Sequence, residues 1–177
     1  MVPGQLTGES APLSISQIGP GFGGFLGIIL ALRHEPSADW SISEIYGVLF
    51  VLAHSFFVAA AGMLPVLLFV SWGDEGKVWL VCQSIVLGFF IAMVAIQTRR
   101  VKRLCGSWLN CNGPRLFKYY VIPTTAITVL IAFSLVVGYG GFGVFVSALG
   151  YALFAAGVQF CLVLRHFVRE ADQRASR

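Results

Sequence analysis

One histidine lies alone within a long apolar stretch and is the strongest candidate in the sequence for chemistry inside a membrane. His54 falls in a run from residue 45 to residue 73 that contains no Asp, Glu, Lys or Arg. At about 1.5 Å of helical rise per residue it lies about 15 Å beyond Glu44, near the middle of a bilayer core about 30 Å thick. Three roles are open for an imidazole at this depth. It can form a structural hydrogen bond between helices, it can lie on a proton or solute pathway, or it can be a metal or haem ligand. The polar residues expected at similar depth are Gln83 or Ser84, Thr128, Ser134 and Gln159.

The other residue types that carry chemistry do not form a recognisable arrangement. Cys82 and Cys161 fall in apolar runs, where a thiol behaves as a small apolar group. Cys105 and Cys111 have no histidine at the spacing of a zinc site. The sequence also lacks a nucleophile elbow, a phosphate-binding loop and paired acids in an apolar run. We therefore expect no catalytic site, no metal site, no cofactor and no enzyme activity.

The elements that position these residues follow from the composition. Of the 177 residues 57% are hydrophobic and 11% are charged, whereas a soluble domain has about 25% charged residues. The longest uncharged run, residues 119–164, exceeds one membrane crossing and is predicted to fold back at the glycine-rich segment Gly138–Gly143. The predicted fold is an all-α integral membrane protein, a single membrane domain over residues 1–177. Its bundle of five transmembrane helices covers residues 13–33, 43–71, 77–99, 118–138 and 144–166.

The first predicted span is the least apolar. It contains Pro20 and five glycines, so a re-entrant or interfacial segment is the alternative for residues 13–33. With the N-terminus outside and the C-terminus cytoplasmic, every Lys and Arg except Lys77 lies on the cytoplasmic side, as the positive-inside rule requires. Trp72 and Trp79 are then expected at the outer headgroup level. The expected location is a bacterial inner membrane or plasma membrane.

A predicted cytoplasmic loop over residues 99–118 contains six basic residues and no acidic one. Such a segment favours contact with the anionic inner leaflet or with an acidic partner, and the alternative is a purely topological role. It is too short to form a nucleic-acid surface, and a short cytoplasmic tail follows over residues 167–177. The candidate contact residues of the loop are Arg99, Arg100, Lys102, Arg103, Trp108, Arg115 and Lys118.

Small residues recur at intervals of four in the first and last predicted helices. Helices associate in lipid where small residues let their backbones approach closely. The two stripes are therefore predicted to make helix contacts, either within the bundle or with another subunit. They consist of Gly19, Gly23 and Gly27, and of Ala148, Ala152 and Ala156.

Two functions fit these expectations. The short loops, the small-residue stripes and the lack of a catalytic motif favour an interaction or assembly subunit, or a modulator, of a membrane complex. Its partner is then another membrane protein or a second copy of itself. The alternative is a small transporter or channel for a neutral or weakly acidic solute, with His54 on the pathway. An intramembrane enzyme acting on a lipid or a quinone is the least favoured hypothesis.

Overall fold

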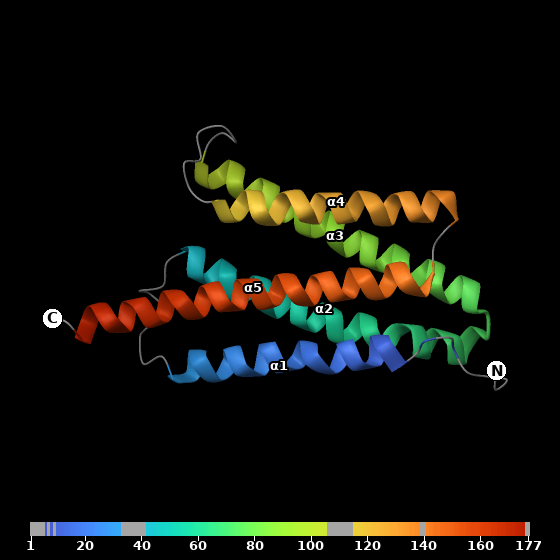
Figure 1. The fold of residues 1–177 in the computed structure, drawn as a ribbon, viewed down its shortest axis with the longest axis horizontal. Coiled ribbons are helices and arrows are strands. Elements are labelled where there is room, and N and C mark those ends of the chain that lie inside the picture. The colour runs from blue at the N-terminus through green and yellow to red at the C-terminus, as the bar shows by residue number, and fades with distance from the viewer. Residues whose placement is uncertain are drawn as a thin grey trace. The chain divides into compact units, whose positions relative to one another are not determined.

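The computed structural model describes residues 6, 8, 10–32, 42–105, 115–138 and 141–175. Within these ranges the regular structure is entirely helical, which confirms the predicted all-α class (Figure 1). Each helix overlaps one predicted segment, while the number of membrane crossings and their orientation stay predictions. The helices are α1 (Ser10–Leu32), α2 (Ile42–Trp72), α3 (Glu75–Cys105), α4 (Arg115–Val137) and α5 (Phe142–Ala175).

Three of the described helices are long and apolar enough to cross a membrane. The suitable stretches are Ile45–Trp72 in α2, Glu75–Arg99 in α3 and Phe142–Arg165 in α5. The apolar part of α4, Ile122–Val137, is shorter, and α1 is not among the candidates within the described ranges. Crossing and interfacial positions both stay open for residues 13–33.

Glycines in the left-handed conformation end two of the helices. Gly73 has a φ of 65°, and its amide donates to the carbonyl of Phe69 at 2.8 Å, which closes the last turn of α2. Asp74 then caps α3, since its Oδ1 accepts from the amide of Lys77 at 3.2 Å. Gly138 has a φ of 74° and ends α4 within the glycine-rich segment where the sequence predicts a turn.

Helices α3 and α5 continue well beyond the C-terminal ends of their predicted spans. The third predicted span ends at residue 99, but α3 continues to Cys105, and α4 begins at Arg115. The predicted loop over residues 99–118 is therefore helical at both ends, and residues 106–114, with Trp108, lie outside the described residues. Arginine and lysine are good helix formers, so leaving an apolar environment does not require the helix to stop. For the same reason α5 runs past residue 166 to Ala175.

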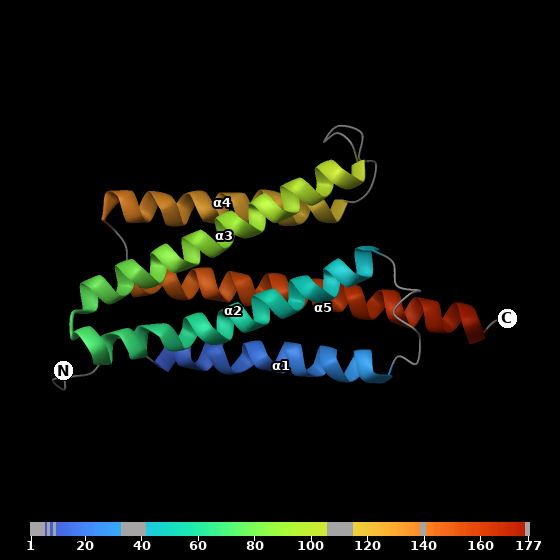
Figure 2. The same cartoon turned by 180° about the vertical axis from the view of Figure 1, so that it is seen from behind.

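The helices belong to two compact units. The α1–α2–α5 unit comprises residues 8–64 and 149–177, and the α3–α4 unit comprises residues 1–7 and 65–148. In the α3–α4 unit, α3 and α4 lie side by side, as both ribbon views show (Figure 1, Figure 2). Both α2 and α5 contribute to each unit, because the unit boundaries fall inside these helices.

The core of the α1–α2–α5 unit joins all three helices. It consists of Leu26, Val48, Val51, Phe160 and Val163. The rings of Phe22 and Phe25 on α1 lie with centroids 5.8 and 5.6 Å from that of Phe160 on α5. Such tilted aromatic pairs hold α1 against α5, and they place the small-residue side of α1 beside α2.

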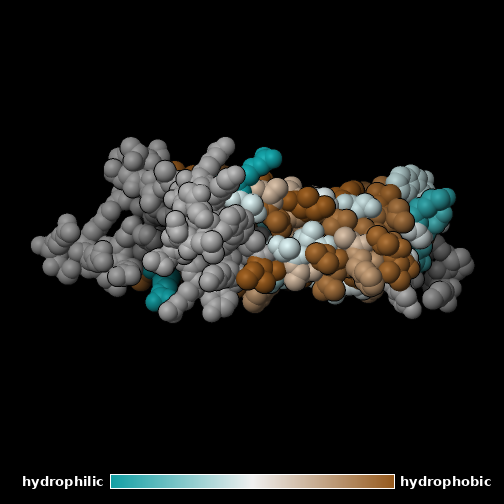
Figure 3. Space-filling model, turned by 90° about the horizontal axis from the view of Figure 1, so that it is seen from above, coloured by the Kyte–Doolittle hydropathy of each residue, from teal (hydrophilic) through white to brown (hydrophobic). Residues whose placement is uncertain are grey.

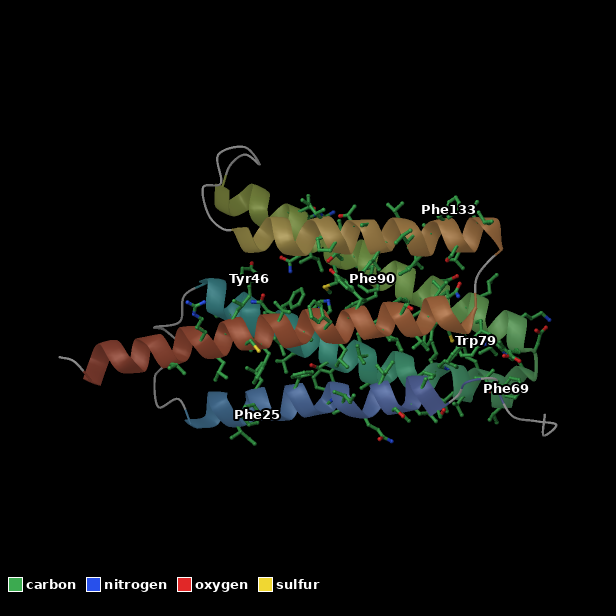
Figure 4. The ribbon with its side chains drawn as sticks, viewed as in Figure 1. Phe25, Tyr46, Phe69, Trp79, Phe90 and Phe133 are labelled. Carbon is green, nitrogen blue, oxygen red and sulfur yellow. The ribbon has the colours of Figure 1, made fainter. Side chains whose placement is uncertain are left out.

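The outer side of α4 is apolar. Figure 3 shows mostly hydrophobic residues on the face that α4 presents to the viewer, and Phe133 points away from α3 in Figure 4. A continuous apolar helix face is suited to contact with lipid chains. Its exposed large residues are Ile122, Val129, Leu130, Phe133, Val136 and Val137.

Candidate functional site

His54 is completely buried in the α1–α2–α5 unit. Its ring stacks on that of Phe50, with centroids 3.9 Å apart and an interplanar angle of 27°. Its Nδ1 lies 3.0 Å from the carbonyl oxygen of Phe50, one helical turn earlier. Because a carbonyl oxygen only accepts, this contact requires the tautomer with hydrogen on Nδ1. The imidazole is therefore held in a fixed orientation against its own helix.

Most of the polar side chains expected at the depth of His54 bond within their own helices. The hydroxyls of Ser84 and Thr128 donate to carbonyls four residues earlier, at 2.8 and 2.7 Å, and Ser134 donates to a carbonyl three residues earlier at 2.8 Å. Gln83 donates instead to the carbonyl of Gly141 at 2.7 Å. The three hydroxyl groups are therefore satisfied within their own helices, as is required where water is absent. Within the described residues, Oε1 of Gln83 is buried without a hydrogen-bond partner.

α1 meets α2 through small residues on both helices. A Cβ at Gly19 would lie 2.7 Å from the backbone oxygen of Ser55, and a Cβ at Gly62 would lie 2.5 Å from the backbone oxygen of Pro12. Gly23 faces α2 more loosely, with Leu52 at 3.8 Å from its would-be Cβ. Gly27, the third member of the predicted stripe, is exposed with open space around it. The structure thus places two of the three glycines against α2.

Gly62 was not among the predicted packing residues, although the sequence contains a signal for it. Ser55, Ala59 and Gly62 are small residues at spacings of four and three, which places them on one side of α2. They face the matching side of α1, since the would-be Cβ of Gly19 lies 3.4 Å from the amide nitrogen of Ala59. Within the described residues, the hydroxyl of Ser55 is buried without a hydrogen-bond partner, its side chain being 1% exposed.

α2 also approaches α5 closely at one glycine. A Cβ at Gly47 would lie 2.8 Å from Cγ2 of Val163 and 3.0 Å from Nε2 of Gln159. Both neighbours are side-chain ends, so this contact can adjust more easily than the backbone contacts of Gly19. The second predicted stripe is buried throughout; its members are Ala148, Ala152 and Ala156.

The opposite side of α1 is exposed, and a strip of small and polar residues runs along it beside the larger exposed side chains of Ile18, Phe25 and Ile28. It carries Ser14, Gln17, Gly21 and Gly24, all exposed, and neither glycine has any atom within 4 Å of a would-be Cβ. Spacings alternate between four and three along this side, which is the heptad pattern of a helix that packs against another helix. α1 therefore has two small-residue sides, one covered by α2 and one uncovered in the described structure.

In the α3–α4 unit, two α3 side chains hold the start of α5. Trp79 packs on Phe142 and Phe145, with ring centroids 5.6 and 5.7 Å away, and donates from Nε1 to Glu75 at 3.1 Å. Trp79 is only 5% exposed, whereas Trp72 is 50% exposed. The expected headgroup depth of these two residues stays a prediction. The Gln83 bond to Gly141 anchors the same turn.

The described part of the structure includes the predicted basic contact residues only in part. Arg99 is exposed at the end of the apolar part of α3. The backbones of Arg100, Lys102, Arg103, Arg115 and Lys118 are helical, and their side chains lie outside the described part of the structure. Across the described residues, no three His, Cys, Asp or Glu side chains gather in a way that could hold a metal ion.

These features define a class: an all-helical protein, over its described ranges, with three helices long and apolar enough to cross a membrane. Comparison with known proteins does not narrow the class. No protein family, no characterised protein and no solved structure matches this sequence.

Proposed function

We propose that the protein is an interaction or assembly subunit, or a modulator, of a membrane complex, and that the outer side of α1 is its contact surface. In this proposal the chain crosses a bacterial inner membrane or other plasma membrane several times, with the N-terminus outside. The partner is a helix of another membrane protein or α1 of a second copy.

The observation that carries the proposal is the character of the uncovered side of α1. Lipid chains favour large apolar side chains, as on α4, whereas α1 exposes a strip of Ser14, Gln17, Gly21 and Gly24. This strip runs beside the larger exposed residues Ile18, Phe25 and Ile28. Glycines allow a second backbone to approach closely, and a glutamine amide hydrogen-bonds across helices in lipid. The heptad spacing matches a left-handed helix pair with a small crossing angle. This side therefore suits a helix better than it suits lipid.

Blocking this side tests the proposal. Gly24→Leu fills open space, so it should leave the fold intact while it prevents close approach of a partner helix. Gly88→Leu is the matched control, because Gly88 is also exposed with open space around it but lies on α3. We expect Gly24→Leu to weaken co-purification of differently tagged copies, or of the partner captured by cross-linking, by about tenfold, and Gly88→Leu to have no effect. Wild-type protein that yields no cross-linked partner and runs as a lone monomer would contradict the proposal.

The alternative function, a small transporter with His54 on the pathway, has less support. The ring of His54 is buried, stacked on Phe50 and bonded to the carbonyl of Phe50. A residue that is held in this way suits a structural role. Loss of solute uptake in His54→Ala at unchanged membrane abundance would favour the transporter over the subunit.

A further inference from the structure

A groove of about 500 Å³ lies beside the turn between α2 and α3. This volume lies within the range of about 300–1,000 Å³ that is typical of ligand sites. Asp74 and Lys77 provide its charged part, and Trp72, Leu80 and Val81 provide apolar walls. The groove therefore combines a charged end with an apolar end, which is the pattern of an amphiphile site.

The position of the groove along the helices points to the same ligand class. The apolar stretch of α2 ends at Trp72, and that of α3 begins at Glu75. If these helices cross a membrane, the groove lies at the headgroup level, where tryptophan side chains are enriched. Leu80 is exposed one to two turns into α3, in the direction of the hydrocarbon core. A lipid in the groove would thus have its headgroup and its chains at their normal depths.

The charges select among headgroups. Nζ of Lys77 lies 2.9 Å from Oδ2 of Asp74, and the two side chains are 75% and 44% exposed, so both are open to a ligand. The hydrogen bond from Lys77 lowers the pKa of Asp74, which is ionised at neutral pH. A pair of this kind at the surface is weak, so its members can exchange to other partners at little cost. A zwitterionic headgroup has one charge for each member of the Asp74–Lys77 pair, whereas the carboxylate of Asp74 repels an anionic headgroup.

We propose that this groove binds a phospholipid with an ethanolamine headgroup. The primary ammonium donates to Asp74, the phosphate accepts from Lys77, and one acyl chain lies along Leu80 and Val81. A choline headgroup has no N–H group to donate to Asp74, and a glycerol headgroup carries no positive charge. This inference does not depend on the proposed role of α1.

The test is binding of three phospholipids with identical chains and ethanolamine, choline or glycerol headgroups to the purified full chain, measured by native mass spectrometry. We expect the wild-type protein to retain the ethanolamine lipid preferentially. Asp74→Asn keeps an N-cap acceptor for the amide of Lys77 but removes the charge, and it should reduce this preference by about tenfold. Lys77→Met should weaken binding of the same lipid through loss of the phosphate contact.

Glu75→Gln is the matched control, because it removes a neighbouring carboxylate that does not line the groove and keeps an acceptor for Trp79. It should bind the three lipids as the wild-type protein does. Equal retention of the three headgroups by the wild-type protein, or an unchanged preference in Asp74→Asn, would overturn the proposal and indicate adventitious annular lipid only. If Asp74→Asn does not fold, Lys77→Met decides, since unchanged binding in that variant also overturns it.

Discussion

Two glycines of one predicted stripe have different surroundings in the structure, which makes them a controlled pair. Gly19 and Gly27 lie on α1 eight residues apart, and the sequence treats them alike. A Cβ at Gly19 would lie 2.7 Å from the backbone oxygen of Ser55, whereas a Cβ at Gly27 would meet nothing within 4 Å. The perturbation is the same in each case, replacement by Ala.

The expected difference can be worked out from these contacts. Both substitutions gain helix propensity, by at most about 1 kcal/mol each, so this contribution cancels when the variants are compared. Gly19→Ala also has to separate α1 from α2, because the atom it meets belongs to the backbone and cannot rotate away. Overpacking of this kind costs about 1–3 kcal/mol. Gly19→Ala should therefore be less stable than Gly27→Ala by about 1–3 kcal/mol.

Thermal unfolding in detergent with a thiol-reactive dye is a suitable assay once Cys105, Cys111 and the exposed Cys161 are replaced by Ser in every variant, because the remaining thiol, Cys82, is completely buried in the folded protein. A loss of about 1–3 kcal/mol corresponds to a decrease in Tm of about 2–12 °C for a chain of this size. Gly27→Ala should unfold at or slightly above the wild-type temperature. Equal Tm values for Gly19→Ala and Gly27→Ala would refute the close approach of α1 to α2.

Two other substitutions test buried groups, and the same unfolding assay measures both. Ser55→Ala should stabilise the protein by about 1 kcal/mol, because it removes a buried hydroxyl that has no hydrogen-bond partner within the described structure; a loss of stability would show that this hydroxyl is bonded. Trp79→Leu should destabilise the protein by about 1–3 kcal/mol through loss of the contacts with Phe142 and Phe145. Trp72 is exposed, so Trp72→Leu should change the stability by less than about 0.5 kcal/mol. Equal effects at both positions would contradict the burial of Trp79.

The placement of the helices could be predicted largely from where charge is absent. Charged side chains are costly in lipid, so uncharged runs identify apolar helices, and the glycines at 138–143 identify the break between α4 and α5. The helix ends were harder to predict. The basic residues after residue 99 do not break a helix, so α3 continues to Cys105 where a loop was predicted.

Which side of a helix faces its neighbours could not be predicted in the same way. Helices that are apolar all round have little amphipathic signal, so sequence spacing does not show which side is covered. Gly27 was grouped with Gly19 and yet is exposed, and Gly62 was missed and yet touches α1. Each outcome depends on the partner helix, which the sequence of a single helix does not specify.

The length of α5 has a mechanical consequence. The helix has 34 residues, which span about 51 Å, and its described stretch that is apolar enough for a membrane, Phe142–Arg165, covers 24 of them. The ten helical residues beyond Arg165 therefore project about 15 Å past that part as a stiff rod. If Phe142–Arg165 crosses a membrane, this extension is longer than the Debye length of about 8 Å at physiological salt, so its end lies beyond the reach of charges at the lipid surface. In the proposed complex, shortening α5 by whole turns should then change the distance at which a partner on this side is first met.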